Sequence, residues 1–179
     1  MGRSVTALAA AALLLVPSAA AARTVVRDPN DSPGLLDVRR VSRFGARPPV
    51  WKISTARRWS AARVQDRGYL LVFFDTFGDD RSDYYALVRS NGREMKARLM
   101  RDPRRARDRR IAYLTAWRRD KRSVSVRVPL RRMTTPRRWF VWRVETLLTG
   151  RRCKRVCFDV APPSGRREPL PGARSSAAR

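Results

Sequence analysis

Apolar side chains along most of this chain recur at every second position, which is typical of strands that bury one face and expose the other. Met95, Ala97 and Leu99, for example, alternate with charged residues. The alternation and short apolar runs predict strands at residues 36–41, 51–55, 69–75, 84–90, 93–101, 111–117, 123–128 and 139–146.

Residues 69–75 depart from strict alternation, because they are apolar at odd and even positions alike. This predicts a central strand that is covered on both faces. We expect it to lie at the heart of the core.

The Asn91-Gly92 dipeptide lies between two predicted strands. Asn-Gly is favoured where both central residues of a turn need a positive φ. The sequence therefore predicts a tight type I′ hairpin here.

No long amphipathic helix or repeat is visible, and about eight short strands are separated by turns. This pattern predicts an all-β fold, an antiparallel two-sheet β-sandwich of the jelly-roll or Ig-like kind. A closed β-barrel is the alternative.

The two ends of the chain differ from this body. Residues 1–22 combine Arg3, an apolar run and an alanine-rich end, which predicts a signal peptide cleaved near Ala22 and too short to span a bilayer. We expect residues 23–160 to form a single domain and residues 161–179, rich in Pro, Gly, Ser, Ala and Arg, to form a disordered C-terminal tail. The protein is then secreted.

Basic residues dominate the composition, with 41 Lys and Arg against 15 Asp and Glu and a formal net charge of +26. Such a charge attracts polyanions in a salt-dependent way. The arginines are spread along the chain, so they could equally form a solvated basic surface without a dedicated ligand.

The sequence lacks residues that several classes of enzyme need for catalysis. There is no histidine, which excludes the usual triads and zinc hydrolases. After export, Cys153 and Cys157 should form a disulfide, which requires the segment between them to turn back on itself because a straight strand would separate them by about 13 Å. A redox-active pair is the less favoured interpretation, because the spacing is not Cys-x-x-Cys.

Four aspartates gather in one short segment: Asp75, Asp79, Asp80 and Asp83. Carboxylates are the ligands that calcium prefers, so a structural calcium ion is possible here. Alternatively, these aspartates shape a turn and pair with arginines. Another group, Asp28, Asp31 and Asp37, could cap the first strand or lend a ligand to the same site.

Aromatic rings next to arginines suggest a binding surface. Trp139 and Tyr84 are the rings expected on the outside of the sheets, where sugars could stack on them, with Arg137 and Arg138 beside them. The same pairs would suit nucleic acid, or could be cation–π packing.

Motifs across most of the chain resemble those of small secreted β-sandwich proteins of the actinobacterial type. They lie at residues 28–37, 74–84, 124–129, 139–142 and 157–165, and in Thr55 followed by Trp59. A weaker similarity is to family-nine carbohydrate-binding and DOMON-like domains, which implies binding of sugars, haem or another ligand, often with structural calcium. The absence of histidine counts against haem.

Taken together, these patterns predict a secreted, non-catalytic binding or interaction module. We expect a monomer with no transmembrane span after signal removal, and a glycan or another polyanionic surface polymer as its partner. A structural wall-associated protein and a hydrolase that uses carboxylates of residues 75–83 are the alternatives. Nucleic acid, attracted by net charge, ranks behind the other polyanions.

Overall fold

The computed structural model describes residues 23–170, apart from positions 46, 104–105, 151–152 and 154. The predicted signal peptide lies outside the described residues, as does the end of the predicted tail from residue 171.

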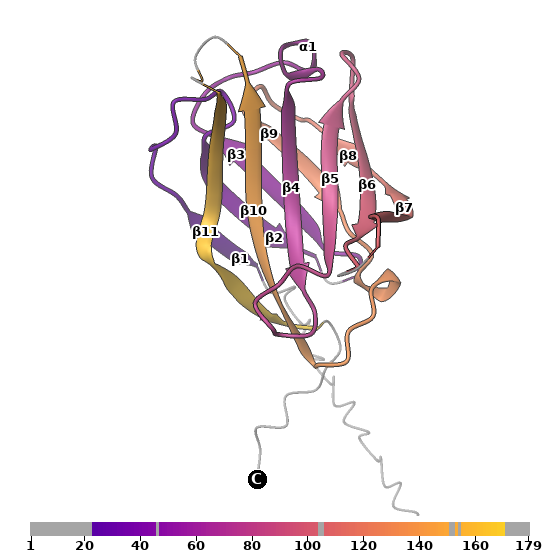
Figure 1. Ribbon diagram of the computed structural model, residues 1–179. Coiled ribbons are helices and arrows are strands. Elements are labelled where there is room, and N and C mark those ends of the chain that lie inside the picture. Colours follow the sequence, from indigo (N-terminus) through magenta and orange to yellow (C-terminus); the bar gives the residue numbers. More distant parts are fainter. Residues whose placement is uncertain (1–22, 46, 104–105, 151–152, 154, 171–179) are drawn as a thin grey trace, which may run out of the picture.

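The described chain forms two antiparallel sheets that stack face to face, as Figure 1 shows. The five-stranded sheet has the order β1-β2-β3-β9-β8, and the six-stranded sheet has the order β11-β10-β4-β5-β6-β7. The strands of the first sheet are β1 (Thr24–Arg27), β2 (Val38–Phe44), β3 (Val50–Thr55), β8 (Ala116–Trp117) and β9 (Ser123–Arg127). Those of the second are β4 (Gly68–Asp75), β5 (Tyr84–Ser90), β6 (Met95–Arg101), β7 (Arg109–Leu114), β10 (Trp139–Thr149) and β11 (Val156–Pro169).

This architecture confirms the predicted β-sandwich, and the sheets do not close into a barrel. One end of the sandwich carries the short helix α1 (Ala61–Val64) and the β5–β6 hairpin, and the opposite end carries the β4–β5 turn (Figure 1). A 3-10 helix, η1 (Leu130–Arg132), precedes β10.

The core lies between the sheets and is centred on large rings. Trp51 of β3 contacts Phe74 of β4 and Trp142 of β10 edge-on, with ring centroids 5.2 Å and 6.2 Å away. These three side chains are at most 1% exposed. They come from both sheets, so their burial holds the two layers together.

Residues 111–117 are not one strand, as predicted, but two. Leu114 ends β7 opposite Ala97 in the six-stranded sheet, whereas Ala116 starts β8 opposite Val126 in the five-stranded sheet. The chain therefore changes sheets at Thr115. The apolar pattern does not reveal this change, because both sheets bury side chains in the same core.

The β5–β6 hairpin is confirmed, but its predicted turn type is wrong. Gly92 has a φ of +93°, while Asn91 is not among the residues with positive φ in the described chain. Instead, the Asn91 side chain accepts hydrogen bonds from the backbone N–H groups of Arg93 and Glu94, at 3.1 Å and 2.9 Å. This side-chain cap closes a wider loop, and Ser90 pairs with Met95 beyond it.

The predicted tail begins too early, because β11 continues through Pro169. Its prolines are tolerated because β11 is an edge strand, where one side of the backbone needs no ladder partner. The pairing register shifts between Trp142 and Val144, opposite the part of β11 that contains Gly165. The composition of residues 161–169 is typical of a tail, and composition alone does not reveal their pairing with β10.

Cys153 and Cys157 form the predicted disulfide, with their Cα atoms 5.2 Å apart. The Cys153 N–H donates to the carbonyl of Gly150, the residue that follows β10. In the described part of the chain, no helix is both long and apolar enough to cross a membrane.

Candidate functional site

The acidic β4–β5 turn is shaped by its own carboxylates. Asp75 accepts hydrogen bonds from the N–H groups of Gly78 and Asp80, at 2.5 Å and 3.0 Å. One oxygen of Asp83 accepts from the Thr76 N–H, the Thr76 hydroxyl and the Phe77 N–H, at 2.7 Å, 3.0 Å and 3.2 Å. These bonds support the turn-forming interpretation of the segment, and calcium binding by residues 75–83 stays a prediction.

Trp139 is partly exposed, at the start of β10, but its ring is covered by cations. The guanidinium carbons of Arg137 and Arg167 lie 4.7 Å and 3.7 Å from the ring centroid. The ring also packs against Gly78, where a side chain would collide with it. Trp139 and Arg137 are therefore brought together, while Arg138 is exposed and binds Leu170 only through its backbone carbonyl.

The prediction that Tyr84 faces outward is wrong. Tyr84 is 3% exposed and points into the core with Ala86 and Val88. Its hydroxyl accepts a hydrogen bond from the Thr134 N–H at 3.0 Å. The ring that lies on the outside of β5 is its neighbour, Tyr85.

The outer face of the six-stranded sheet carries the apolar side chains that had suggested two-sided burial of β4. Leu70, Val72 and Phe74 are fully buried in the core, so Leu71 and Phe73 must point to the opposite face. The other sheet does not cover that face, although Leu71 is only 9% exposed there. Phe73 is accordingly half-buried at the surface.

The strand register aligns one row of side chains across this face. From β10 to β7 the row, called here the ring row, contains Arg143, Phe73, Tyr85, Met100 and Arg110. The two rings are in contact, with centroids 5.6 Å apart, and the Arg143 guanidinium lies 5.2 Å from the centroid of Phe73. The row thus places two aromatic rings between two arginines.

A further ring extends this surface at the edge strand β7. Tyr113 is 69% exposed, and the guanidinium groups of Arg110 and Arg98 lie 4.1 Å and 5.8 Å from its ring centroid. Arg98 is its cross-strand partner. Stacking of guanidinium on an exposed ring leaves the outer donors of the arginine available to a ligand.

Two adjoining cavities, of about 230 Å³ and 420 Å³, open beside the ring row. We call them the outer hollow, and both are lined by Phe73, Asp80, Ser82 and Arg143. Asp102 also lines the larger cavity. The Ser82 hydroxyl is buried and has no hydrogen-bond partner among the described residues. The outer hollow therefore combines an aromatic wall with hydrogen-bond donors and acceptors.

Burial and neighbouring carboxylates raise the pKa of two groups near the outer hollow, Asp102 and Tyr85. Burial, followed by the charges of Asp108 and Asp83, raises the pKa of Asp102 above its usual value. Burial also raises the pKa of Tyr85, as does the hydrogen bond that its hydroxyl donates to Asp108 at 2.5 Å. Arg143 donates from Nε to Glu145 at 2.7 Å, which leaves its terminal nitrogens for other partners.

A second group of acidic residues lies away from this face. Oxygens of Asp28, Asp31 and Asp159 all lie within 4.8 Å of one another. The sequence groups Asp28, Asp31 and Asp37, which do lie in one region, but it does not point to Asp159. No local pattern could have found Asp159, because β11 joins this region only through folding.

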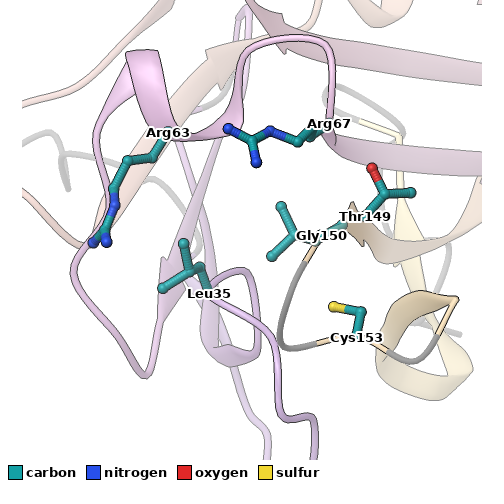
Figure 2. A pocket seen from close by; sticks show the side chains of 7 residues that line it. Leu35, Arg63, Arg67, Thr149, Gly150 and Cys153 are labelled. Carbon is teal, nitrogen blue, oxygen red and sulfur yellow. The ribbon is translucent and has the colours of Figure 1, made fainter.

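A pocket of about 380 Å³ lies at the α1 end of the sandwich. Figure 2 shows Arg63 and Arg67 on one side of it and Leu35, Gly150 and Cys153 on the other. Apart from the Thr149 hydroxyl, its side-chain lining is apolar or cationic. It has fewer groups that can bind sugar hydroxyls than the outer hollow has.

Comparisons of the chain with protein-family models, with curated proteins and with solved structures found no match in any of the three.

Proposed function

We propose that this protein is an exported, non-catalytic binding module that holds an acidic glycan on the outer face of its six-stranded sheet. The observation that carries this proposal is the ring row, in which Phe73 and Tyr85 lie between Arg143 and Arg110 on an uncovered sheet face. By an acidic glycan we mean a polysaccharide whose sugar units carry carboxylates.

The chemistry of the ring row and the outer hollow matches such a ligand. Aromatic faces pack against the apolar faces of sugar rings, and a few fixed polar groups give orientation. Guanidinium groups bind carboxylates through paired hydrogen bonds. Arg143 next to Phe73 offers both contacts at one place, with its guanidinium 5.2 Å from the ring.

Carboxylates in the outer hollow favour a glycan over nucleic acid. Asp80 and Asp102 line it beside Arg143. Carboxylates accept hydrogen bonds from sugar hydroxyls, but they repel the closely spaced phosphates of a nucleic acid backbone. A glycan with charges on separated units can place hydroxyls on the aspartates and carboxylates on the arginines.

Binding is favoured over catalysis by the state of the turn carboxylates. Asp75 and Asp83, which a carboxylate-based hydrolase would need free, are engaged by backbone N–H groups of their own turn. The Cys153–Cys157 disulfide is compatible with an oxidising extracellular setting. These observations support the proposal of a secreted binding protein.

The test is isothermal titration with an oligogalacturonate and with its neutral methyl ester. We expect the acid to bind and the ester to bind at least about tenfold more weakly, because the ester loses its charge-assisted bonds. Two variants probe the surface: Arg143→Gln, and Tyr113→Ala, whose ring is 69% exposed and outside the core. Each should weaken binding of the acid by about tenfold.

Arg127→Gln is the matched control. Arg127 also stacks on a ring, Trp117, at 5.6 Å, but it belongs to the five-stranded sheet. Arg127→Gln removes the same charge as Arg143→Gln, and it should leave the affinity for the oligogalacturonate unchanged. Equal losses in Arg143→Gln and Arg127→Gln would mean that net charge alone attracts the polymer. Tighter binding of single-stranded DNA at the same salt concentration would also overturn the proposal.

A further inference from the structure

Three aspartates meet where the two sheets come together at one edge of the sandwich, and a fourth, Asp37, lies near them. Asp28 follows β1, Asp31 lies in the connector, Asp37 precedes β2, and Asp159 belongs to β11 of the other sheet. Oxygens of Asp28, Asp31 and Asp159 lie within 4.8 Å of one another. Such a grouping is costly unless something offsets the repulsion between the negative charges.

A second observation is independent of this clustering. Asp37 is only 1% exposed, yet its Oδ2 has no hydrogen-bond partner in the described part of the protein. Oδ2 of Asp28 is likewise buried and unpartnered. A buried carboxylate oxygen without a donor costs free energy, so a missing partner is expected for both atoms.

The Asp37 carboxylate lies near this group and interacts with it electrostatically. Burial is the main cause that raises the pKa of Asp28 and of Asp159, and the charge of Asp37 adds to both shifts. Its other oxygen, Oδ1, is held by the Ser32 N–H at 3.3 Å. The unpartnered oxygen is therefore available to a group bound among the aspartates.

Arginines, although abundant, do not neutralise this cluster by direct contact. Among the described residues, no ion pair reaches Asp28, Asp31, Asp37 or Asp159. Burial raises the pKa of Asp37, and Arg57, acting at longer range, only partly opposes this rise; its guanidinium donates to the Pro33 carbonyl at 3.0 Å. Although the net charge of the chain is +26, no cation of the described part of the chain forms an ion pair with these four carboxylates.

We propose that Asp28, Asp31, Asp37 and Asp159 form a binding site for a divalent cation, Ca²⁺, at the seam between the two sheets. An all-oxygen donor set suits a hard cation. Calcium accepts six to eight oxygens in flexible geometry, so backbone carbonyls and water can complete the shell, whereas Mg²⁺ demands a near-ideal octahedron. The site contains no histidine or thiol that would favour zinc.

The cation would link segments that are far apart in the sequence. Asp159 of β11 already accepts a hydrogen bond from the Val38 N–H of β2 at 2.5 Å. A cation shared by Asp159, Asp28 and Asp31 adds the β1–β2 connector to this junction. Calcium should therefore stabilise the folded state, since the unfolded chain does not hold these carboxylates together.

The test is thermal unfolding of the chain from residue 23 onward at neutral pH, with a chelator or with increasing Ca²⁺. We expect a saturable rise in Tm of about 5 °C, with a Kd on the order of 10⁻⁴ to 10⁻³ M as in extracellular modules. Asp31→Asn should weaken Ca²⁺ binding at least about tenfold. Asp31 is exposed, so this variant should still fold.

Asp80→Asn is the matched control, because Asp80 is an exposed carboxylate in the β4–β5 turn. It should keep the full calcium response. The absence of any rise in Tm, even at millimolar Ca²⁺, would overturn the proposal. So would a response that Asp80→Asn removes and Asp31→Asn keeps, since the ion would then bind the β4–β5 turn. Terbium luminescence gives a second readout that does not depend on stability.

Discussion

Arg43 on β2 and Glu168 on β11 form a buried ion pair that joins the two sheets, with 3.4 Å between Arg43 Nη1 and Glu168 Oε2. The two side chains are only 5% and 8% exposed. The Arg43 guanidinium also lies 5.8 Å from the ring centroid of Trp51 and 5.9 Å from that of Phe140. The ion pair is therefore buried beside two aromatic rings of the core.

Breaking this pair from one side should destabilise the protein strongly. Arg43→Met removes the buried guanidinium and leaves the Glu168 carboxylate with the Thr24 hydroxyl and the more exposed Arg166, whose Nε lies 3.8 Å away. We therefore expect a loss of about 3 kcal/mol in the free energy of unfolding, at the lower end of the range for a broken buried pair. The double variant Arg43→Met/Glu168→Leu should be close to wild type, because it removes both charges from the core. Denaturant unfolding of both variants measures these values. Additive losses in the double variant would contradict this account.

The stability of the protein should depend on pH through the protonation of Asp28 in the aspartate cluster. Burial, followed by the charges of Asp159, Asp31 and Asp37, raises the pKa of Asp28 from 3.8 to about 6. The folded state therefore binds this proton more tightly than the unfolded state does. The stabilisation is complete below about pH 4 and is lost as the pH rises through 6.

Asp28→Asn isolates this contribution. In chelator, its Tm should rise relative to wild type between pH 4 and pH 7, because the amide never acquires the charge that the neighbouring aspartates and burial oppose. Calcium should oppose the wild-type loss above pH 6, by replacing the proton. A constant difference in Tm across this range would show that Asp28 does not titrate in this way.

Replacing the hairpin glycine, Gly92, should destabilise the protein. Gly92 has a φ of +93°, and an added Cβ would collide with the Gln65 side chain. Gly92→Ala should cost more than about 1 kcal/mol, through backbone strain together with this contact. Adding Gln65→Ala should recover only the part due to the contact. Arg93→Ala, at an exposed position in the same loop, is the control and should be neutral.

Local patterns were sufficient to predict most of the sandwich. Alternation located β3, β6, β9 and β10, and in β10 the alternating residues Phe140, Trp142 and Val144 are all at most 1% exposed. The disulfide followed from two cysteines and a short spacing. These features depend on neighbouring residues, which the sequence displays directly.

Features that depend on distant pairing were not predictable. The alternating pattern gives β5 no clear phase, because Tyr84 and Tyr85 are both aromatic and both sets that follow are largely apolar. The structure buries Tyr84 and leaves Tyr85 on the outside. Asp159 and Val38 are 121 positions apart in the sequence, and they lie side by side only because β11 closes the edge of the sandwich.

The pattern of apolar residues at both odd and even positions of β4 predicted its position in the sheet correctly but did not predict that one of its faces lies at the surface. It predicted a central strand, and β4 is central in its sheet. It also predicted cover on both faces, but only one face meets the other sheet. The uncovered residues include Phe73, the ring at the centre of the proposed binding surface.

The most direct test of the proposed binding surface is an NMR titration of the isotope-labelled protein with the oligogalacturonate. We expect the amide shifts to concentrate in β4, β5 and β10 around Phe73, Tyr85 and Arg143, and the five-stranded sheet to remain unperturbed. Shifts centred on β2, β3 and β9, or spread evenly over the arginines of both sheets, would contradict an acidic-glycan site on the ring row.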